Sequence, residues 1–131
     1  MSVNEHYNAE TDKFFSGIND RPLVFLCRED LNKIRSLTIP IAGFGGVGAI
    51  VAELLARWGI EKFRLLDNDR YDITNIQRQV FATASTLGCY KAEVAAKRIM
   101  EIDPYSGIEM VICEKLSRET CERFIAGQIL Y

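Results

Sequence analysis

Short apolar runs alternate along this chain with stretches in which apolar residues recur every three or four positions. A continuous apolar run is typical of a buried strand, and the longer spacing is typical of a helix. Strands are predicted at residues 37–42, 62–66 and 108–113, and helices at residues 10–15, 29–34, 46–58, 90–102 and 117–124. The run at 23–27 is predicted to be a short strand or a packed loop. Strands that alternate with helices over short connections predict an α/β fold with a mainly parallel sheet.

Several element ends carry their own signals. Pro40 lies inside the first strand, where it removes one hydrogen-bond donor, so its side of the strand is expected to be open or irregular. Gly59 is placed to end the preceding helix in a left-handed turn, and Ser117 is placed to cap the last helix. Residues 129–131 resemble the start of another strand. The fold is therefore expected to be truncated after the third strand–helix unit.

Length, charge and composition narrow the class of protein. A chain of 131 residues with 48% hydrophobic and 26% charged residues is typical of one globular domain. A net charge of -2 gives no reason to expect nucleic acid or an anionic membrane as the main partner. No apolar run is long enough to span a bilayer, and the N-terminus lacks the pattern of a signal peptide. A cytoplasmic location is expected.

Cysteine and histidine usage gives no sign of a metal site. The four cysteines, Cys27, Cys89, Cys113 and Cys121, are far apart and form no Cys-x-x-Cys pair. They are interpreted as free thiols, partly buried as small apolar residues. His6 is the single histidine, so a zinc site held wholly by this chain is not expected.

A glycine-rich turn joins the first predicted strand to the helix that follows it. Gly43, Gly45 and Gly48 have the spacing Gly-x-Gly-x-x-Gly, and Gly46 is an additional glycine. In such a turn the first glycine allows the tight bend, the second admits a phosphate close to the backbone, and the third allows close helix–strand packing. The helix would direct its free N–H groups at an anion. This arrangement favours a Rossmann-like three-layer fold that binds a nucleotide.

Acidic and polar residues follow the second predicted strand. Asp67 lies about 20 residues after the turn, where a carboxylate commonly accepts hydrogen bonds from ribose hydroxyls. Asp69 is either a functional acid or a solvent-facing turn residue. A polar cluster then follows, which consists of Thr74, Asn75, Arg78, Gln79 and Lys91. Cations and amides beside a phosphate loop suit a triphosphate, because negative charge grows on the leaving group during reaction.

Together these motifs resemble a known family. The motifs are Gly43-x-Gly45-Gly46-x-Gly48, Leu66-Asp67-x-Asp69, Thr74-Asn75-Ile76-x-Arg78-Gln79 and Gly88-x-x-Lys91. Over residues 37–113 the chain resembles the ThiF/MoeB/HesA family, the adenylyltransferases that are similar to ubiquitin-activating enzymes. The resemblance implies that ATP and Mg²⁺ are used to adenylate the C-terminal carboxylate of a ubiquitin-like or sulfur-carrier protein, with release of pyrophosphate. Some members instead activate a small peptide or a carboxylate on a modified tRNA base.

The resemblance also implies roles for individual residues. Arg78 and Lys91 would contact the phosphates and stabilise charge as pyrophosphate departs, so they are the expected catalytic residues. The expected nucleotide-binding residues are Gly43, Gly45, Gly46, Gly48, Asp67, Asp69, Thr74, Asn75 and Gln79. No metal ligand is expected within the chain, since the family's magnesium-binding aspartate would lie beyond residue 131. The chain alone is therefore expected to be incomplete for catalysis.

Domain organisation and partners follow from the same resemblance. Residues 1–36 are expected to form a helical or extended arm, and residues 37–131 the N-terminal portion of the ATP-binding domain. A homodimer is implied, because the sites of the family form in dimers. The family commonly has an arginine after a Tyr-Asn-like pair that reaches the partner's phosphates, but here Ala9 follows that pair. Either the arginine is lost, or Arg21 or Arg28 replaces it.

Two other function classes remain open. The glycine turn and Asp67 also suit an NAD-binding oxidoreductase or sensor, which would bind NAD tightly and ATP weakly. Ala9 and the missing downstream aspartate suit a non-catalytic relative, which would bind nucleotide without turnover.

Overall fold

The computed structural model describes residues 8–126, so His6 and the predicted strand start at residues 129–131 lie outside the described residues. Three strands, β1 (Thr38–Ala42), β2 (Lys62–Leu66) and β3 (Gly107–Ile112), form one parallel sheet in the order β1-β2-β3. Each strand agrees with its predicted bounds to within one residue. The α/β fold with a parallel sheet is confirmed.

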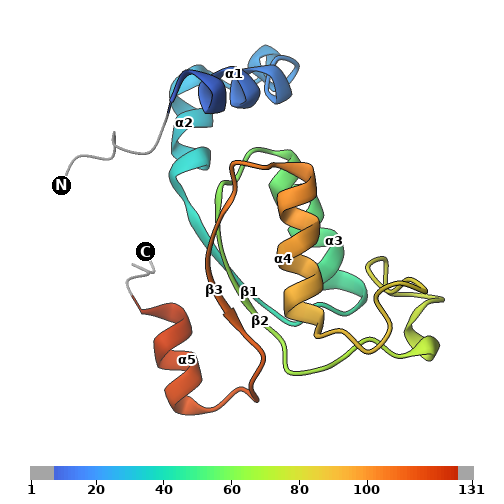
Figure 1. The fold of residues 1–131 in the computed structure, drawn as a ribbon. Coiled ribbons are helices and arrows are strands. Elements are labelled where there is room, and N and C mark those ends of the chain that lie inside the picture. Colours follow the sequence, from blue (N-terminus) through green and yellow to red (C-terminus); the bar gives the residue numbers. More distant parts are fainter. Residues whose placement is uncertain (1–7, 127–131) are drawn as a thin grey trace.

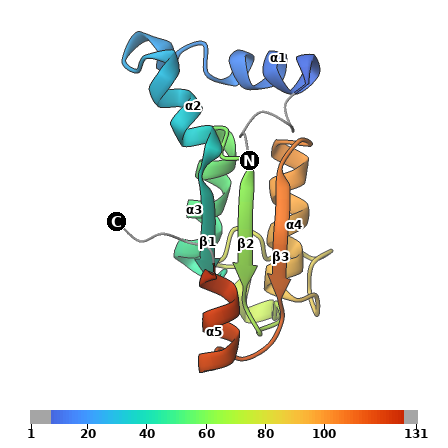
Figure 2. The same ribbon diagram turned by 90° about the vertical axis from the view of Figure 1, so that its left-hand side faces the viewer.

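Helices lie on both faces of this sheet and give the fold three layers (Figures 1 and 2). α3 (Gly46–Arg57) and α4 (Lys91–Ile102) cover one face, and α5 (Arg118–Ile125) lies on the other side at the carboxyl ends of the strands. The main core lies between the sheet and the helix pair, with Phe63 and Leu65 fully buried. A smaller cluster beneath α5 consists of Leu66, Ile112 and Phe124. Within residues 8–126, no helix has the length and apolar character needed to cross a membrane.

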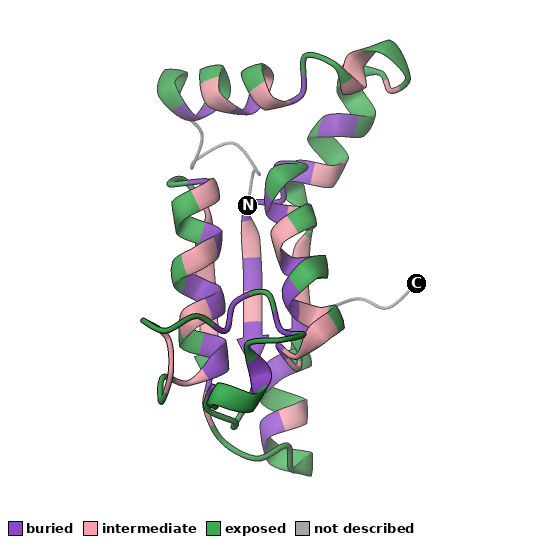
Figure 3. Ribbon diagram, turned by 90° about the vertical axis from the view of Figure 1, so that its right-hand side faces the viewer, coloured by how far each residue is buried: buried purple, intermediate pink, exposed green. Residues whose placement is uncertain are grey.

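The helix α3 packs onto the core through alanines. Ala49, Ala52 and Ala56 have no exposed surface, and short side chains let the helix approach the sheet and α4 closely. The larger apolar residues that revealed this helix in the sequence lie elsewhere: Val47 is 77% exposed and Leu54 is 53% exposed. Figure 3 shows the buried residues on the inner sides of the two helices and exposed ones on their outer sides. The helix was therefore predicted correctly, but of its large apolar residues only Leu55 packs against the core.

The amino-terminal part of the chain lies beyond the amino ends of the strands (Figure 2). It contains α1 (Ala9–Ile18), a 3₁₀ helix (Pro22–Val24) and α2 (Arg28–Ser36). The predicted strand at 23–27 is wrong, because residues 22–24 form the 3₁₀ helix. The residues that follow form a turn, but it is not packed, since Phe25 is 89% exposed. Both α-helices extend further than the sequence pattern predicted.

A buried ion-pair network ties these two helices to the sheet. Arg35 on α2 donates from Nε to Glu61 Oε1 at 2.7 Å and from Nη1 to Asp12 Oδ1 at 2.7 Å. Its guanidinium also lies 4.5 Å from the centre of the Phe15 ring. Burial raises the pKa of Glu61 above its usual value, an effect that the neighbouring Arg35 only partly offsets. The network fixes α1 and α2 at the end of the sheet opposite the glycine turn.

Pro40 occupies the edge strand of the described sheet. Gly43 N–H donates to Leu66 O, so alternate residues of β1 direct their N–H groups toward β2. Pro40 is out of phase with Gly43 and therefore has its missing donor on the opposite side, where no described strand pairs with β1. The prediction that this side is open is confirmed within residues 8–126.

Candidate functional site

The predicted site residues come together at the carboxyl ends of the parallel strands. The glycine turn follows β1, Asp67 follows β2, and the segment that leads to α4 runs past both (Figure 2). Ligands of open α/β sheets bind in the crevice at this end of the strands. The topology alone therefore gathers residues from three separate sequence motifs.

Two glycines of the turn are required by its geometry. Gly43 has a φ of +91°, a left-handed conformation that residues with a side chain rarely adopt. At Gly48 an added Cβ would lie 1.8 Å from the carbonyl oxygen of Gly43, so the start of α3 packs directly against the turn. Gly45 is the N-cap of α3 and has no side chain to cap it. The first N–H groups of α3 are thus left to bind an anion.

Asp67 holds the turn in place. Its side chain is 8% exposed; Oδ2 accepts a hydrogen bond from Phe44 N–H at 2.7 Å, and Oδ1 accepts one from Asp69 N–H at 2.8 Å. Each carboxylate oxygen has a second acceptor position, so contact with ribose hydroxyls remains compatible with these bonds. The carboxylate therefore has a structural role that the sequence did not predict.

Tyr71 provides a second contact to the same turn. Its hydroxyl donates to Phe44 O at 2.9 Å, and the side chain is 2% exposed. Burial raises the pKa of this hydroxyl well above its usual value, so it stays protonated and keeps donating. Sequence reasoning missed Tyr71, because its partner lies 27 positions earlier and no local pattern reveals the contact.

The polar cluster begins with a capped 3₁₀ helix over Ile73–Asn75. Asp72 accepts hydrogen bonds from the N–H and the hydroxyl of Thr74, and these bonds lower the pKa of the Asp72 carboxyl. Asn75 Oδ1 accepts from Asp72 N–H, which leaves the amide NH₂ of Asn75 to donate elsewhere. The Thr74 hydroxyl thus serves the cap, and Asn75 remains a candidate to contact a nucleotide.

Arg78 and Gln79 pack against the glycine turn. Arg78 is exposed and donates from Nη1 to Thr74 O at 2.7 Å, and an added Cβ at Gly46 would lie 3.5 Å from Arg78 O. Gln79 is 7% exposed, and its Nε2 would lie 3.9 Å from an added Cβ at Gly45. Among the described residues, Gln79 Oε1 has no hydrogen-bond partner. A buried acceptor without a partner beside this turn is suited to a ligand.

Lys91, the first residue of α4, approaches the site from the other side. Its side chain is 8% exposed, and Nζ lies 3.4 Å from Asp69 Oδ2 and 5.6 Å from the centre of the Tyr71 ring. Asp69 therefore functions at least as the ion-pair partner of Lys91. The sequence did not reveal Arg70, whose guanidinium lies 3.6 Å from the centre of the Tyr90 ring at the rim of this site.

The described residues do not form a metal site. Within residues 8–126, no group of three or more His, Cys, Asp or Glu residues could hold a metal ion. All four cysteines are free thiols, with Cys27 and Cys89 exposed and Cys113 and Cys121 half-buried. The interpretation of the cysteines as free thiols is confirmed, but their predicted partial burial is wrong for Cys27 and Cys89. The described residues therefore do not fit Mg²⁺.

The two candidate replacements for the missing arginine lie far from the glycine turn of their own chain. Arg21 precedes the 3₁₀ helix and Arg28 begins α2, both at the amino end of the sheet (Figure 2). Neither can contact a phosphate bound at the carboxyl end of the same sheet.

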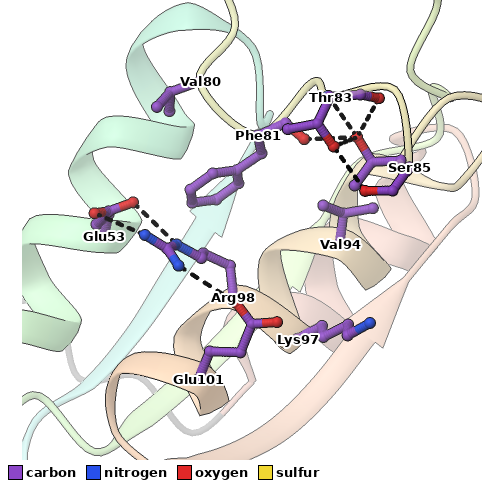
Figure 4. Close-up of a pocket in the computed structure, with 10 residues that line it drawn as sticks. Glu53, Val80, Phe81, Thr83, Ser85, Val94, Lys97, Arg98 and Glu101 are labelled. Carbon is purple, nitrogen blue, oxygen red and sulfur yellow. Dashed lines mark hydrogen bonds and ion pairs between the residues drawn. The ribbon is translucent and has the colours of Figure 1, made fainter.

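A separate cavity of about 430 Å³ lies between α3, α4 and the loop that follows Gln79 (Figure 4). Phe81 and Val94 contribute apolar lining. Arg98 donates hydrogen bonds of 3.3 Å to both carboxylate oxygens of Glu53. Hydrogen bonds from Arg57 and Arg98 hold the pKa of Glu53 below its usual value. None of the predicted site residues lines this cavity, so it is distinct from the candidate nucleotide site.

Comparison with known proteins identifies the family. The model of the ThiF family matches residues 19–129. The chain belongs to the ThiF family. Its ThiF relatives include a tRNA threonylcarbamoyladenosine dehydratase of Bacillus subtilis, 39% identical over 99 residues, which are 74% of this chain and 38% of the relative. A probable molybdopterin-synthase adenylyltransferase of Porphyra purpurea is 37% identical over 82 residues, which are 63% of this chain and 22% of the relative.

Solved ThiF-like structures give the same fold. The tRNA N6-threonylcarbamoyladenosine dehydratase of E. coli matches with a TM-score of 0.78 and 30% identity, covering 96% of this chain and 48% of that one. A structure of that protein in complex with ATP matches with a TM-score of 0.78 and 29% identity, covering 92% of this chain and 47% of that one. This ThiF chain therefore spans about half the length, or less, of the proteins it resembles.

Proposed function

We propose that this chain is the nucleotide-binding portion of an ATP-dependent adenylyltransferase. A carboxylate oxygen of the substrate attacks the α-phosphorus of ATP, a bond to this phosphorus forms, and its bond to the bridging oxygen breaks, so that pyrophosphate leaves. The observation that carries the proposal is the uncapped start of α3, flanked by Arg78 on one side and Lys91 on the other. Two cations beside free N–H groups suit the charge that accumulates on departing pyrophosphate.

The remaining residues of the site position the nucleotide. Asp67 accepts the ribose hydroxyls, and its existing bond to Phe44 N–H keeps the turn aligned with the sugar. Asn75 donates its free NH₂ group to a phosphate, and Gln79 offers its unpartnered Oε1 to a donor group of the ligand. Lys91 exchanges its contact with Asp69 for a phosphate oxygen when ATP enters. Mg²⁺ would be held by residues that the described part of the chain does not supply.

The acyl substrate is one of two classes. Relatives named as tRNA threonylcarbamoyladenosine dehydratases favour a carboxylate on a modified tRNA base. A relative named molybdopterin-synthase adenylyltransferase, together with the resemblance to ubiquitin-activating enzymes, favours the C-terminal carboxylate of a ubiquitin-like or sulfur-carrier protein. Both classes share one chemistry, the activation of a carboxylate by adenylation. We also propose that the protein forms a homodimer and is located in the cytoplasm.

Exchange of labelled pyrophosphate into ATP tests the proposal, measured with the full-length protein and each substrate class in turn. Arg78→Ala and Lys91→Ala should each lose about 2–4 kcal/mol of transition-state stabilisation, a fall of roughly 30- to 1000-fold in exchange rate. Lys97→Ala on the outer part of α4 is the matched control and should exchange at the wild-type rate. Full exchange in both site variants would overturn the assignment of Arg78 and Lys91.

Calorimetry separates this function from the two alternatives. The proposal requires ATP to bind more tightly than NAD. Tight binding of NAD with weak binding of ATP would instead favour an oxidoreductase or sensor. Tight binding of ATP without exchange for any carboxylate, at full length, would favour a non-catalytic relative.

A further inference from the structure

Arg70 and Tyr90 form a stacked pair at the rim of the candidate nucleotide site. They lie opposite each other in an isolated antiparallel bridge. Backbone hydrogen bonds join the residues that flank the bridge on both sides, and one of them runs from Lys91 N–H to Asp69 O at 2.9 Å. The bridge itself is therefore a pair without hydrogen bonds of its own, the position at which cross-strand side chains approach most closely. The guanidinium carbon lies 3.6 Å from the centre of the ring, so the two groups are stacked.

The guanidinium of Arg70 is fixed in this position. Its Nη1 donates a hydrogen bond of 2.7 Å to Gly88 O, and Gly88 N–H in turn donates to Tyr71 O at 2.8 Å. Tyr90 is half-buried and is the N-cap residue of α4, so its ring belongs to the framework of the site. Within residues 8–126, no carboxylate forms an ion pair with Arg70, and its Nε and Nη2 have no partner. The pair thus presents a preorganised cation with no counter-charge.

The stacked pair faces away from the glycine turn. Successive side chains of an extended segment point to opposite sides. Tyr71 points inward, because its hydroxyl bonds to the turn, and Lys91 is on the same side, with Nζ 5.6 Å from the centre of the Tyr71 ring. Arg70 and Tyr90 alternate with these two residues and are directed outward, and Arg70 is exposed. A group stacked on Arg70 is therefore separated from a nucleotide at the turn by the two bridged segments.

We propose that the outer face of Arg70 is a stacking platform for an unpaired base of an RNA substrate. The plane of a guanidinium stacks on nucleobases, and single-stranded RNA is commonly bound in this way. Tyr90 covers one face of the plane and leaves the other face to a base. The donors Nε and Nη2 lie along the edge of the plane, where they are available to a base edge or to a phosphate. The uncompensated charge adds attraction to the RNA backbone.

This step rests on the proposed function and selects RNA from its two substrate classes. An enzyme that acts on a base takes that base out of its stack, so the adjacent base loses a stacking partner. Arg70 replaces this partner at the rim while the modified base reaches the nucleotide on the inner side. A carboxylate at the end of a peptide chain displaces no ring and has no use for such a platform.

Binding of a hairpin RNA tests the platform without any chemistry. The probes are an RNA hairpin with a single-stranded loop and the same hairpin with abasic sites in the loop, and fluorescence anisotropy at fixed salt measures the affinity of the full chain for each. Wild type should bind the intact loop roughly 5- to 150-fold more tightly, the range that stacking of one base gives.

Arginine-to-lysine variants show whether the plane or the charge of Arg70 carries this preference. Arg70→Lys keeps the charge and loses the plane, so it should bind the two hairpins with equal affinity. Arg57→Lys is the matched control and should keep the preference, because Arg57 ends α3 at the opposite end from the glycine turn and pairs with Glu53. Equal affinity of wild type for both hairpins, or a full preference in Arg70→Lys, would overturn the platform.

Variants of Tyr90 test the support behind the guanidinium. Tyr90→Phe retains the ring and should keep the preference for the intact loop. Tyr90→Leu removes the ring that orients Arg70 and should lower the preference severalfold, with urea unfolding as the check that the variant is folded. A preference of wild-type size in folded Tyr90→Leu would contradict the role given to Tyr90.

Pyrophosphate exchange separates the platform from the proposed function. With a tRNA whose modified base carries a carboxylate, Arg70→Lys should raise the KM for the tRNA roughly 5- to 150-fold and leave the KM for ATP unchanged. A loss of ATP affinity as large as the loss of RNA affinity would assign the platform to the adenine of ATP and overturn the proposal. Exchange that requires a carrier protein, in a chain that binds neither hairpin, would overturn the platform and leave adenylation standing. Base-dependent hairpin binding without exchange for any carboxylate would reject the proposed function and leave the platform standing.

Discussion

The contact between Gly48 and Gly43 gives the sharpest test of how the glycine turn is built. A Cβ at position 48 would lie 1.8 Å from Gly43 O and 2.9 Å from Gly43 C. Non-bonded heavy atoms rest about 3.5 Å apart, so in Gly48→Ala the start of α3 or the turn must move by on the order of 1.5 Å. Both sides of the contact are backbone, so no change of rotamer relieves it. Forced packing of this kind costs about 1–3 kcal/mol of folding free energy.

The same displacement should abolish nucleotide binding. Hydrogen bonds need donor–acceptor distances of about 2.7–3.2 Å, and a shift of more than 1 Å moves the N–H groups of α3 out of that range. Urea unfolding and calorimetry with ATP measure the two effects. Gly17→Ala, on α1 at the other end of the sheet, is the control, because an added Cβ there meets nothing within 4 Å. If Gly48→Ala unfolds at the same urea concentration as this control and binds ATP equally well, the reasoning is refuted.

Two further predictions concern side chains that the structure pairs. Tyr71→Phe removes the donor to Phe44 O and leaves a buried carbonyl unsatisfied, so the unfolding free energy should fall by about 1–3 kcal/mol; unchanged urea unfolding would contradict this. Hydrogen bonds from Arg57 and Arg98 lower the pKa of Glu53 in the folded protein below the usual 4.5. The ionised carboxylate therefore stabilises the fold above pH 4.5, and this stabilisation is lost as the pH falls through the pKa of the folded protein. Glu53→Gln should therefore be less stable than wild type by roughly 0.5–1 kcal/mol at pH 7, with a difference that shrinks below about pH 4.5, and a difference independent of pH would refute it.

The regular elements could be predicted because each carries a local signal. The strand at residues 62–66 and the helix that begins at Gly46 were predicted with the bounds that the structure gives them, to within one residue. Their periodicities, the glycine after the helix and the serine before the last helix are all properties of adjacent residues. The strand predicted at residues 23–27 was wrong, because a short apolar run does not by itself indicate whether its side chains are buried. Pro22 begins a 3₁₀ helix there, and its apolar residues are left partly or largely exposed.

The site was predictable where its chemistry depends on spacing and not where it depends on distant contacts. The glycines and Asp67 have a spacing that the strand–turn–helix geometry dictates. In contrast, Tyr71 reaches Phe44 only because β2 lies beside β1. The hydroxyl of Thr74 donates a hydrogen bond to Asp72, so it serves the cap of the 3₁₀ helix and is not free to donate to a nucleotide. The sequence motif does not show this local contact. Sequence therefore predicted which residues gather at the candidate site, and the structure shows which of them already bond to one another.

The helix α3 shows why hydrophobic pattern alone could not reveal which side chains form the core. Its large apolar residues produced the helical periodicity, and periodicity identifies an apolar face without saying what covers it. Close approach to the sheet required small residues, so Ala52 and Ala56 took the inner positions and Leu54 and Trp58 were left on the outer face. Periodicity therefore located the helix without revealing that its buried face consists of alanines.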